Sequence, residues 1–327
     1  MNARRRLVLA AVAAGLTRAG YAWAQTPARV AQIGWITSQP LATAPVRAVF
    51  TGAMRERGWI EGSNYVLESL HYEGRVERIP GLAAQLVQRR VDVIVVSGSL
   101  AMGPVMKATS TIPIVFLTVG DPVGSGFVSN LSRPGGNVTG QGGLAEGLFG
   151  KTLALLKQAV PGAKRIGVLL NPAFAPHVDV MAGAEPVAQR LGLLLRPVAM
   201  RSPQDVDGAF AALAADRVDA VSLLGQAFLP AHAARFGALS LEHRLPMINP
   251  FNELVRAGVL FSYGWKIEDE VRRLPYFLDR ILNGAAPGDM PVEQPSRFYL
   301  VINLKAARAL GLTMPQSMLL QAEEVIE

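Results

Sequence analysis

The sequence predicts an α/β protein built from two similar lobes, each around a parallel sheet. Two observations lead to this prediction. Short apolar runs alternate with longer amphipathic runs, and the whole alternation begins again in the second half of the chain. Alternating strands and helices are typical of βαβ units around a parallel sheet. The short runs are almost continuously apolar, which indicates strands covered on both faces.

The amino-terminal segment has the pattern of a secretory signal peptide, which we assign to residues 1–24. Three arginines at 4–6 precede an apolar run of 11 residues at 7–17, and Ala-Trp-Ala at 22–24 offers a cleavage site. The apolar run is shorter than the roughly 20 residues that span a bilayer. The sequence therefore predicts a periplasmic protein with a cleaved leader. The adjacent arginines leave the twin-arginine route open beside the general export route.

Composition excludes several classes of protein. The formal charge of +7 becomes +3 without the four arginines of residues 1–24, so the basic balance lies largely in the leader. Beyond the leader no cluster of basic residues remains, which argues against a nucleic-acid partner. The chain has no cysteine, which excludes disulfides, thiolate metal ligands and a cysteine nucleophile.

The first lobe begins directly after the leader. Its expected strands are 30–36, 66–70, 91–96 and 113–118, and its expected helices are 46–57, 79–89 and 100–108. A long helical run at 146–160 follows. Most of the short runs are rich in β-branched residues, and the longer runs place apolar residues three and four positions apart.

An internal repeat then defines the second lobe. IGW at Ile33 is echoed by IGV at Ile166, 133 positions later, and RVD at Arg90 is echoed at Arg217, 127 positions later. IPIVF, which starts at position 112, is echoed by LPMIN at position 245, again 133 later. Three landmarks that keep their order and nearly their spacing predict two lobes of similar structure.

The carboxyl-terminal part is expected to cross between the lobes. It contains a strand at 259–262, a helix at 267–282 that ends at Asn283-Gly284, a strand at 298–302 and a helix at 304–310 that is stopped by Gly311. These segments follow the nominal end of the second lobe. We therefore predict lobe 1 from residues 28–141 and 264–288, and lobe 2 from residues 142–263 and 289–327.

Candidate ligand-binding residues follow the predicted strands, because ligands of parallel α/β sheets bind beyond the carboxyl ends of the strands. They are Ser38, Ser97, Ser99, Thr118, Asp121, Asn171, Gln226, Asn249, Asn252, Ser262 and Tyr263. Small hydroxyls and amides can orient a small polar ligand, although each can equally cap a following helix. The carboxylate of Asp121 suits either a ligand ammonium group or such a cap. Aromatic residues that could cover a ligand are Trp35, Phe174, Phe228, Phe251 and Tyr263.

Catalytic and metal-binding readings find little support. The histidines, at positions 71, 177, 232 and 243, show neither HxH nor HxxxH spacing, so we expect them on the surface. Neither a G-x-S-x-G elbow nor a phosphate loop occurs. The glycine run 140–145 matches G-x-G-x-x-A, but the next predicted strand ends at Asn171 rather than at an acid. We read that run as the turn where the chain leaves the first lobe, and we predict no metal, cofactor or catalytic residue.

Two segments resemble a known family. GDPVGSGFVSNLSRPGGNVTG at 120–140 and VINLKAARALGLTMPQS at 301–317 look like the ABC-transporter substrate-binding family that includes tryptophan- and tyrosine-binding proteins. The resemblance implies the type I periplasmic-binding-protein fold, in which two Rossmann-like lobes are joined by a multi-strand hinge. It also implies a non-catalytic protein that delivers a small molecule to a membrane permease and its ATPase, and we expect a monomer. Asp121 would then meet the ammonium group of an amino-acid-like ligand.

One departure from the family bears on the ligand. Many relatives carry a proline-x-aspartate element after the strand that matches Val218, where this chain has Gly225-Gln226-Ala227-Phe228. The change favours a less cationic or flatter ligand. Two alternatives to an importer subunit stay open: a ligand sensor of the same fold that docks on a membrane receptor, and an exported enzyme with a nucleotide or carboxylate site.

Overall fold

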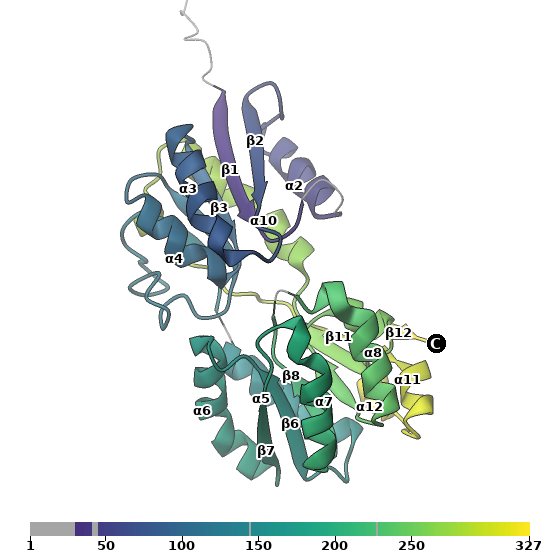
Figure 1. Ribbon diagram of the computed structural model, residues 1–327. Helices are drawn as coiled ribbons and strands as arrows, with labels where there is room; N and C mark the ends of the chain where they lie inside the picture. The colour runs from purple at the N-terminus through teal and green to yellow at the C-terminus, as the bar shows by residue number, and fades with distance from the viewer. Residues whose placement is uncertain (1–29, 41–44, 144, 227) are drawn as a thin grey trace, which may run out of the picture. The chain divides into compact units, whose positions relative to one another are not determined.

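The computed structural model describes residues 30–40, 45–143, 145–226 and 228–327. The expected signal peptide, residues 1–24, and Ala227 of the departure from the family lie outside these ranges. Within them, no helix is long and apolar enough to cross a membrane. The described chain forms the two sheets drawn in Figure 1.

The first sheet has five parallel strands in the order β2-β1-β3-β4-β5. The strands are β1 (Ala31–Thr37), β2 (Tyr65–His71), β3 (Val93–Ser97), β4 (Ile114–Val119) and β5 (Val138–Gly142). Its helices are α2 (Pro45–Arg55), α3 (Ile79–Gln88), α4 (Ser99–Ala108) and α10 (Ile267–Leu282). Apolar side chains of α2 and α10 cover one face, and those of α3 and α4 cover the other.

The second sheet has seven strands in the order β12-β11-β10-β9-β8-β6-β7, and its one antiparallel pair is β10 with β11. The strands are β6 (Arg165–Leu170), β7 (Leu194–Ala199), β8 (Ala220–Leu223), β9 (Met247–Asn249), β10 (Phe261–Gly264), β11 (Tyr299–Asn303) and β12 (Glu324–Ile326). Its helices are α5 (Ala145–Ala159), α6 (Ala175–Arg190), α7 (Val206–Ala215), α8 (Ala233–Glu242), α9 (Asn252–Arg256), α11 (Leu304–Ala309) and α12 (Gln316–Leu319). Short 3₁₀ turns occur at Val76–Arg78, Pro203–Asp205, Pro230–His232 and Pro287–Asp289. Helices α5, α6, α11 and α12 cover one face of this sheet. Helices α7, α8 and α9 cover the other face.

The internal repeat is confirmed by the strand order. The order β7-β6-β8-β9-β10 in the second sheet repeats β2-β1-β3-β4-β5 in the first. The glycine of each IGW or IGV motif lets a helix approach its strand. A side chain at Gly34 would meet Leu86 of α3 at 2.6 Å, and one at Gly167 would overlap Leu213 of α7.

The RVD motif has the same role in both copies. Arg90 and Arg217 both follow a helix in the left-handed conformation, with φ of 53° and 49°. The aspartate two positions later then accepts a backbone N–H at the start of the neighbouring strand. Asp92 Oδ2 accepts from Gln32 N at 2.8 Å, and Asp219 Oδ2 accepts from Arg165 N at 2.7 Å.

The glycine run 140–145 was predicted as the turn where the chain leaves the first lobe, but its residues 140–142 belong to a strand, so the prediction was wrong for them. This strand is β5, whose residues are all buried, and only after it does the chain leave the sheet. A side chain at Gly140 would overlap the backbone of Phe116, and one at Gly142 would overlap that of Val119. The glycines therefore serve close strand packing, a use that a turn-like composition hides.

Among the described residues, the chain leaves one sheet for the other after β5, between β10 and α10, and between Met290 and β11. The third passage runs beside the first, since Glu293 N donates to Gly140 O at 3.0 Å and Gly142 N donates to Glu293 O at 2.9 Å. Met290 packs in the core of the first sheet. The precise lobe boundaries stay predictions.

Candidate functional site

The carboxyl ends of β1, β3 and β4 lie along one edge of the first sheet, because the strands are adjacent and parallel. This edge brings together Ser38, Ser97, Ser99 and Thr118. Ser97 Oγ accepts a hydrogen bond from Trp35 Nε1 at 2.8 Å, and Ser99 Oγ accepts one from Gly120 N at 3.4 Å. Ser38 lies past the end of β1, where its carbonyl accepts from Glu73 N at 2.9 Å. All three serines are partly exposed, and each is also held by one of these hydrogen bonds.

Thr118 is strained. Its φ of 54° is unusual for a β-branched residue, and it lies where the β4–β5 register shifts between Phe116 and Val119. Its backbone N–H donates to Glu270 Oε2 on α10 at 3.1 Å, and its hydroxyl donates to Leu117 O at 2.7 Å. Strained backbone of this kind is concentrated at binding and catalytic sites.

Asp121 closes a turn rather than starting a helix. Its Oδ1 accepts the N–H of Gly124 at 2.8 Å, and residues 122–127 continue as turns and bends. The alternative of an N-cap for a following helix was therefore wrong, because no helix follows Asp121 in the described segment before β5. The carboxylate is partly exposed and follows directly on the Thr118–Gly120 segment.

In the second sheet, one buried histidine connects the ends of β6 and β8. His177 Nδ1 accepts from Asn171 N at 2.9 Å, and its Nε2 lies 3.1 Å from Gly225 O. Because Nδ1 accepts, the proton of the neutral ring is on Nε2 and is donated to Gly225 O. Burial lowers the pKa of His177 to about 4. The expectation of a surface position was wrong for this residue, whose side chain is 5% exposed.

The amides that follow β6 and β8 differ in their partners. Asn171 Oδ1 accepts from Ala173 N at 2.9 Å and so forms a local turn. Gln226 Nε2 is buried and has no hydrogen-bond partner among the described residues. An unpaired buried donor at a strand end requires an explanation, and a ligand oxygen would provide one.

The remaining candidates of the second sheet form an internal network. Asn249 Oδ1 accepts from Phe251 N at 2.7 Å, and its Nδ2 donates to Phe261 O at 3.3 Å. Ser262 Oγ, which is fully buried, donates to Asn252 Oδ1 at 2.7 Å. These three polar side chains therefore hold the ends of β9 and β10 together.

The aromatic candidates differ in exposure. Trp35 is 1% exposed and packs edge-on against Phe50 at a centroid distance of 5.2 Å, so it belongs to the core. Tyr263 is partly exposed and stacks on Phe298 at 5.8 Å, and partial burial raises its pKa. The other three, Phe174, Phe228 and Phe251, are partly exposed after β6, β8 and β9.

Glu270 was not predicted as a site residue. Its side chain is 4% exposed, and burial raises its pKa to about 8, opposed by the hydrogen bond from Thr118 N. Its Oε1 is buried without a partner among the described residues, and its backbone carbonyl accepts from Gln141 Nε2 at 2.8 Å. A sequence signal existed, because position 270 falls on the apolar stripe of α10 with Val271, Leu274 and Leu278.

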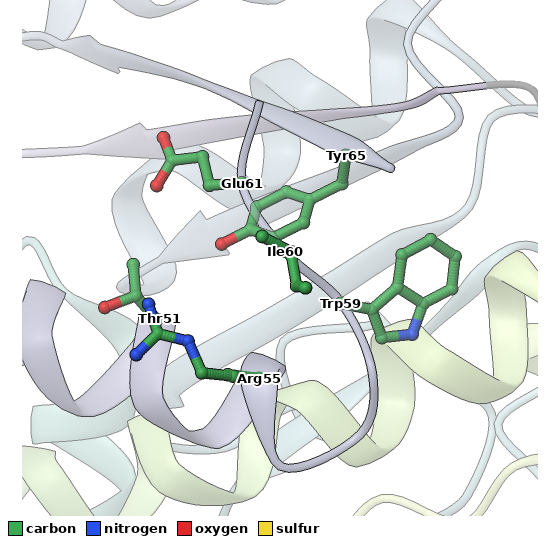
Figure 2. Close-up of a pocket in the computed structure, with 6 residues that line it drawn as sticks. All are labelled: Thr51, Arg55, Trp59, Ile60, Glu61 and Tyr65. Carbon is green, nitrogen blue, oxygen red and sulfur yellow. The ribbon is translucent and has the colours of Figure 1, made fainter. Parts of the chain in front are cut away.

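A separate pocket lies at the opposite end of β2 (Figure 2). It has a volume of about 250 Å³ and is lined by Thr51, Arg55, Trp59, Ile60, Glu61 and Tyr65. Burial and then the nearby Glu61 carboxylate raise the pKa of Tyr65 to about 12. Tyr65 is the first residue of β2. The seven residues of this strand extend roughly 20 Å at about 3.3 Å per residue, so the pocket is separated by about the length of the strand from the carboxyl end where the candidate residues lie. No predicted ligand-binding residue lines this pocket.

The described residues contain no group of three or more histidine, aspartate and glutamate side chains that could hold a metal ion. What they provide at the carboxyl ends of both sheets is a set of hydroxyl, amide, carboxyl and aromatic groups. Such groups can bind a small organic molecule through hydrogen bonds and apolar contacts.

Comparison with known proteins also indicates a protein that binds a small molecule. The family model for ABC transporter substrate binding proteins matches residues 38–326. A tyrosine-binding protein of Clostridioides difficile is 24% identical over 263 residues, which are 80% of this chain and 75% of that protein.

Solved structures of the same fold are also similar. A conserved domain protein from Vibrio cholerae is 27% identical with a TM-score of 0.84, covering 91% of this chain and 100% of that one. The ABC domain from Streptococcus pneumonia, solved in complex with L-Trp, is 24% identical with a TM-score of 0.81, covering 90% and 99%. The predicted fold, two α/β lobes of the type I periplasmic-binding-protein class, is confirmed. The chain belongs to the family of ABC transporter substrate-binding proteins.

Proposed function

We propose that this substrate-binding protein captures a small amino-acid-like molecule, polar or aromatic, at the carboxyl-end edges of its two sheets. The observation that carries the proposal is a set of buried polar atoms that lack partners among the described residues at strand ends. Gln226 Nε2 follows β8, and His71 Nδ1 lies at the end of β2. Leaving such an atom unpaired costs about 1–3 kcal/mol. A ligand that supplies the missing partner would recover this cost on binding.

The ligand class follows from the chemistry of the edge and from the relatives. Asp121 offers a partly exposed carboxylate for an ammonium group, and Ser97, Ser99 and Thr118 offer hydroxyls beside it. Partly exposed Phe174, Phe228 and Tyr263 offer faces for a flat apolar part. The relatives are a tyrosine-binding protein and a protein solved with L-Trp. L-tryptophan and L-tyrosine are therefore the first candidates.

Capture would proceed by closure of the two lobes about the three connecting segments. A ligand shifts an equilibrium between open and closed states only by its differential affinity for them. In this proposal Ser97 of the first lobe and Asn171 of the second both contact the bound molecule. Each neutral hydrogen bond to the ligand would contribute about 1 kcal/mol net.

The proposal also covers the cellular role. The leader at 1–24 would direct the chain to the periplasm, where the monomer would deliver its ligand to a permease driven by an ATPase. In this role the ligand is released unchanged, so the protein would have no catalytic activity.

A thermal-shift screen of residues 25–327 against amino acids and aromatic acids tests the proposal. A ligand that binds only the folded state adds about 2.7 kcal/mol to the free energy of unfolding at one hundred times its Kd. We expect a shift with an amino acid that is strongly reduced in Asp121→Asn. Asp216→Asn, which alters an exposed acid after α7, serves as the control and should keep the shift. No shift with any compound, or an equal loss in both variants, would speak against the proposal.

A further inference from the structure

The loop that carries two candidate ligand residues is held by a buried acid of another element. Thr118 combines a left-handed backbone with a β-branched side chain at a register shift of the β4–β5 pair. Such a conformation persists only where surrounding contacts enforce it. One of the contacts that hold this segment is the hydrogen bond of 3.1 Å from Thr118 N to Glu270 Oε2 on α10.

Glu270 is itself fixed from two sides. Its carbonyl accepts from Gln141 Nε2 of β5 at 2.8 Å, so the first turn of α10 is joined to β5 as well as to the end of β4. Gln141 is 6% exposed and Glu270 4% exposed. The carboxyl therefore stands in an interior position, and its Oε1 has no partner among the described residues to stabilise a negative charge.

We propose that Glu270 is a positioning residue for the loop 118–121, and that it holds the strained Thr118 backbone in place only while its carboxyl carries a proton. A buried carboxylate with one N–H partner is costly, and opening the loop would admit water to the free oxygen. Loss of the proton would thus open the loop. The inference rests on the proposed function only in treating this loop as part of the ligand site.

The elements packed against α10 offer no free positive charge that would stabilise an ionised Glu270 carboxylate among the described residues. Helix α10 packs against α2, β3, β4 and β5, and the three strands contain no ionisable side chain. In α2, Arg47 is paired with Glu61 at 2.6 Å, and Arg55 lines the distant pocket of Figure 2. The ionisable neighbours of Glu270 on its own helix are Glu268, Asp269, Arg272 and Arg273.

Two of these neighbours on α10 have partners elsewhere. Asp269 accepts a hydrogen bond from Tyr299, and Arg273 pairs with Glu293. The influences on the pKa of Glu270 are accordingly burial, which raises it to about 8, and the Thr118 N–H, which opposes the rise. The proton is therefore retained at neutral pH in the closed loop and lost from the open loop.

The direction of the pH effect follows from proton linkage. In the open loop a hydrated Glu270 has an ordinary pKa near 4.5, and in the closed loop the pKa is about 8. Between these values the closed loop binds one proton more, so the opening equilibrium rises by up to about tenfold per pH unit and levels off above pH 8.

Amide hydrogen exchange of the ligand-free protein, residues 25–327, tests this from pH 5 to 8.5. The readout is the protection of residues 118–121, corrected for the intrinsic pH dependence of exchange. Protection in the wild type should fall by up to about tenfold per pH unit up to pH 8. In Glu270→Gln, which keeps an oxygen for Thr118 N–H but cannot ionise, it should stay flat. Glu268→Gln, two residues earlier in the first turn of α10, should behave as the wild type.

Two comparisons keep the test decisive. Residues of β8, Ala220–Leu223, report global opening and should stay better protected than residues 118–121 at every pH, so that exchange of the loop reports local opening. Glu270→Asp retains the carboxyl but shortens its reach to Thr118, and should lower protection of the loop at every pH. A flat profile in the wild type, or the same fall in Glu270→Gln, would overturn the proposal. Because no ligand is added, a failure to find any ligand would count against the proposed function and would leave this result intact.

Discussion

The hydroxyl of Tyr299 on β11 donates a hydrogen bond of 2.6 Å to the carboxylate of Asp269 in the first turn of α10. β11 belongs to the second sheet, whereas α10 packs in the core of the first. Lys266, in the segment that leads into α10, lies 4.1 Å above the Tyr299 ring. These contacts join elements of the two sheets next to a connecting segment. In the proposed function, closure of the lobes would take place about this segment.

Tyr299→Phe is expected to lower the free energy of unfolding by about 2 kcal/mol, because a hydrogen bond to a charged acceptor contributes about 1.5–3 kcal/mol. Urea unfolding measures the loss. Tyr276→Phe is the matched control, since its hydroxyl accepts from Arg280 at the surface of α10 and its loss should cost well under 1 kcal/mol. Equal effects of the two substitutions would contradict a structural role for the Tyr299–Asp269 contact.

Two buried groups predict an asymmetric pH dependence of stability. His177 has a folded-state pKa of about 4, below its ordinary 6.5, so it disfavours the folded state as the pH falls from 6.5 to 4. Glu270 has a folded-state pKa of about 8, above its ordinary 4.5, so its contribution to stability is full below 4.5 and is lost as the pH rises to 8. The two contributions oppose one another between 4.5 and 6.5, and only the loss from Glu270 continues above 6.5.

Chemical unfolding at several pH values measures this profile. From these groups we expect little change between pH 4.5 and 6.5 and a decline between 6.5 and 8. Glu270→Gln should abolish the decline and be more stable than the wild type at pH 8. A wild type that gains stability between pH 6.5 and 8, or a variant that declines as steeply, would show that Glu270 does not retain a proton in the folded state.

Gly140→Ala should be strongly destabilising. Its added methyl group would overlap the backbone of Phe116, and φ at this position is 152°. We expect a loss of more than about 3 kcal/mol, in the range reserved for core disruption. Gly52→Ala on α2 is the control, because nothing lies within 4 Å of the added carbon and alanine favours a helix by about 0.5–1 kcal/mol. Comparable thermal unfolding of both variants would contradict the close packing of β5 on β4.

Much of the fold could be predicted from the sequence because its signals are repeated and local. The offsets of the IGW and RVD motifs correspond to matching strands and matching backbone roles in the two sheets. The helix predicted at 267–282 has those bounds in the structure, where Asn283-Gly284 ends it. β5 was missed because its glycines serve contacts with β4, and such contacts leave no local pattern.

The site was less accessible to sequence analysis. Residues after strands can be identified as candidates, but their hydrogen bonds cannot, so the network of Asn249, Asn252 and Ser262 was indistinguishable from a ligand-binding set. His177 and Glu270 each lie on the apolar face of a helix, in register with Val180 and Leu274 respectively. A polar residue at such a position is the sequence signal of a buried group, and it can be read only by placing each polar residue on its helical face.

Equilibrium dialysis of residues 25–327 against L-tryptophan and L-tyrosine, followed by chemical analysis of the recovered ligand, tests the central claim most directly. The account predicts saturable binding of one molecule per chain and quantitative recovery of unchanged ligand. Conversion of the ligand, or the absence of saturable binding to these and to the other amino acids and aromatic acids of the screen, would contradict a substrate-binding protein for amino-acid-like molecules.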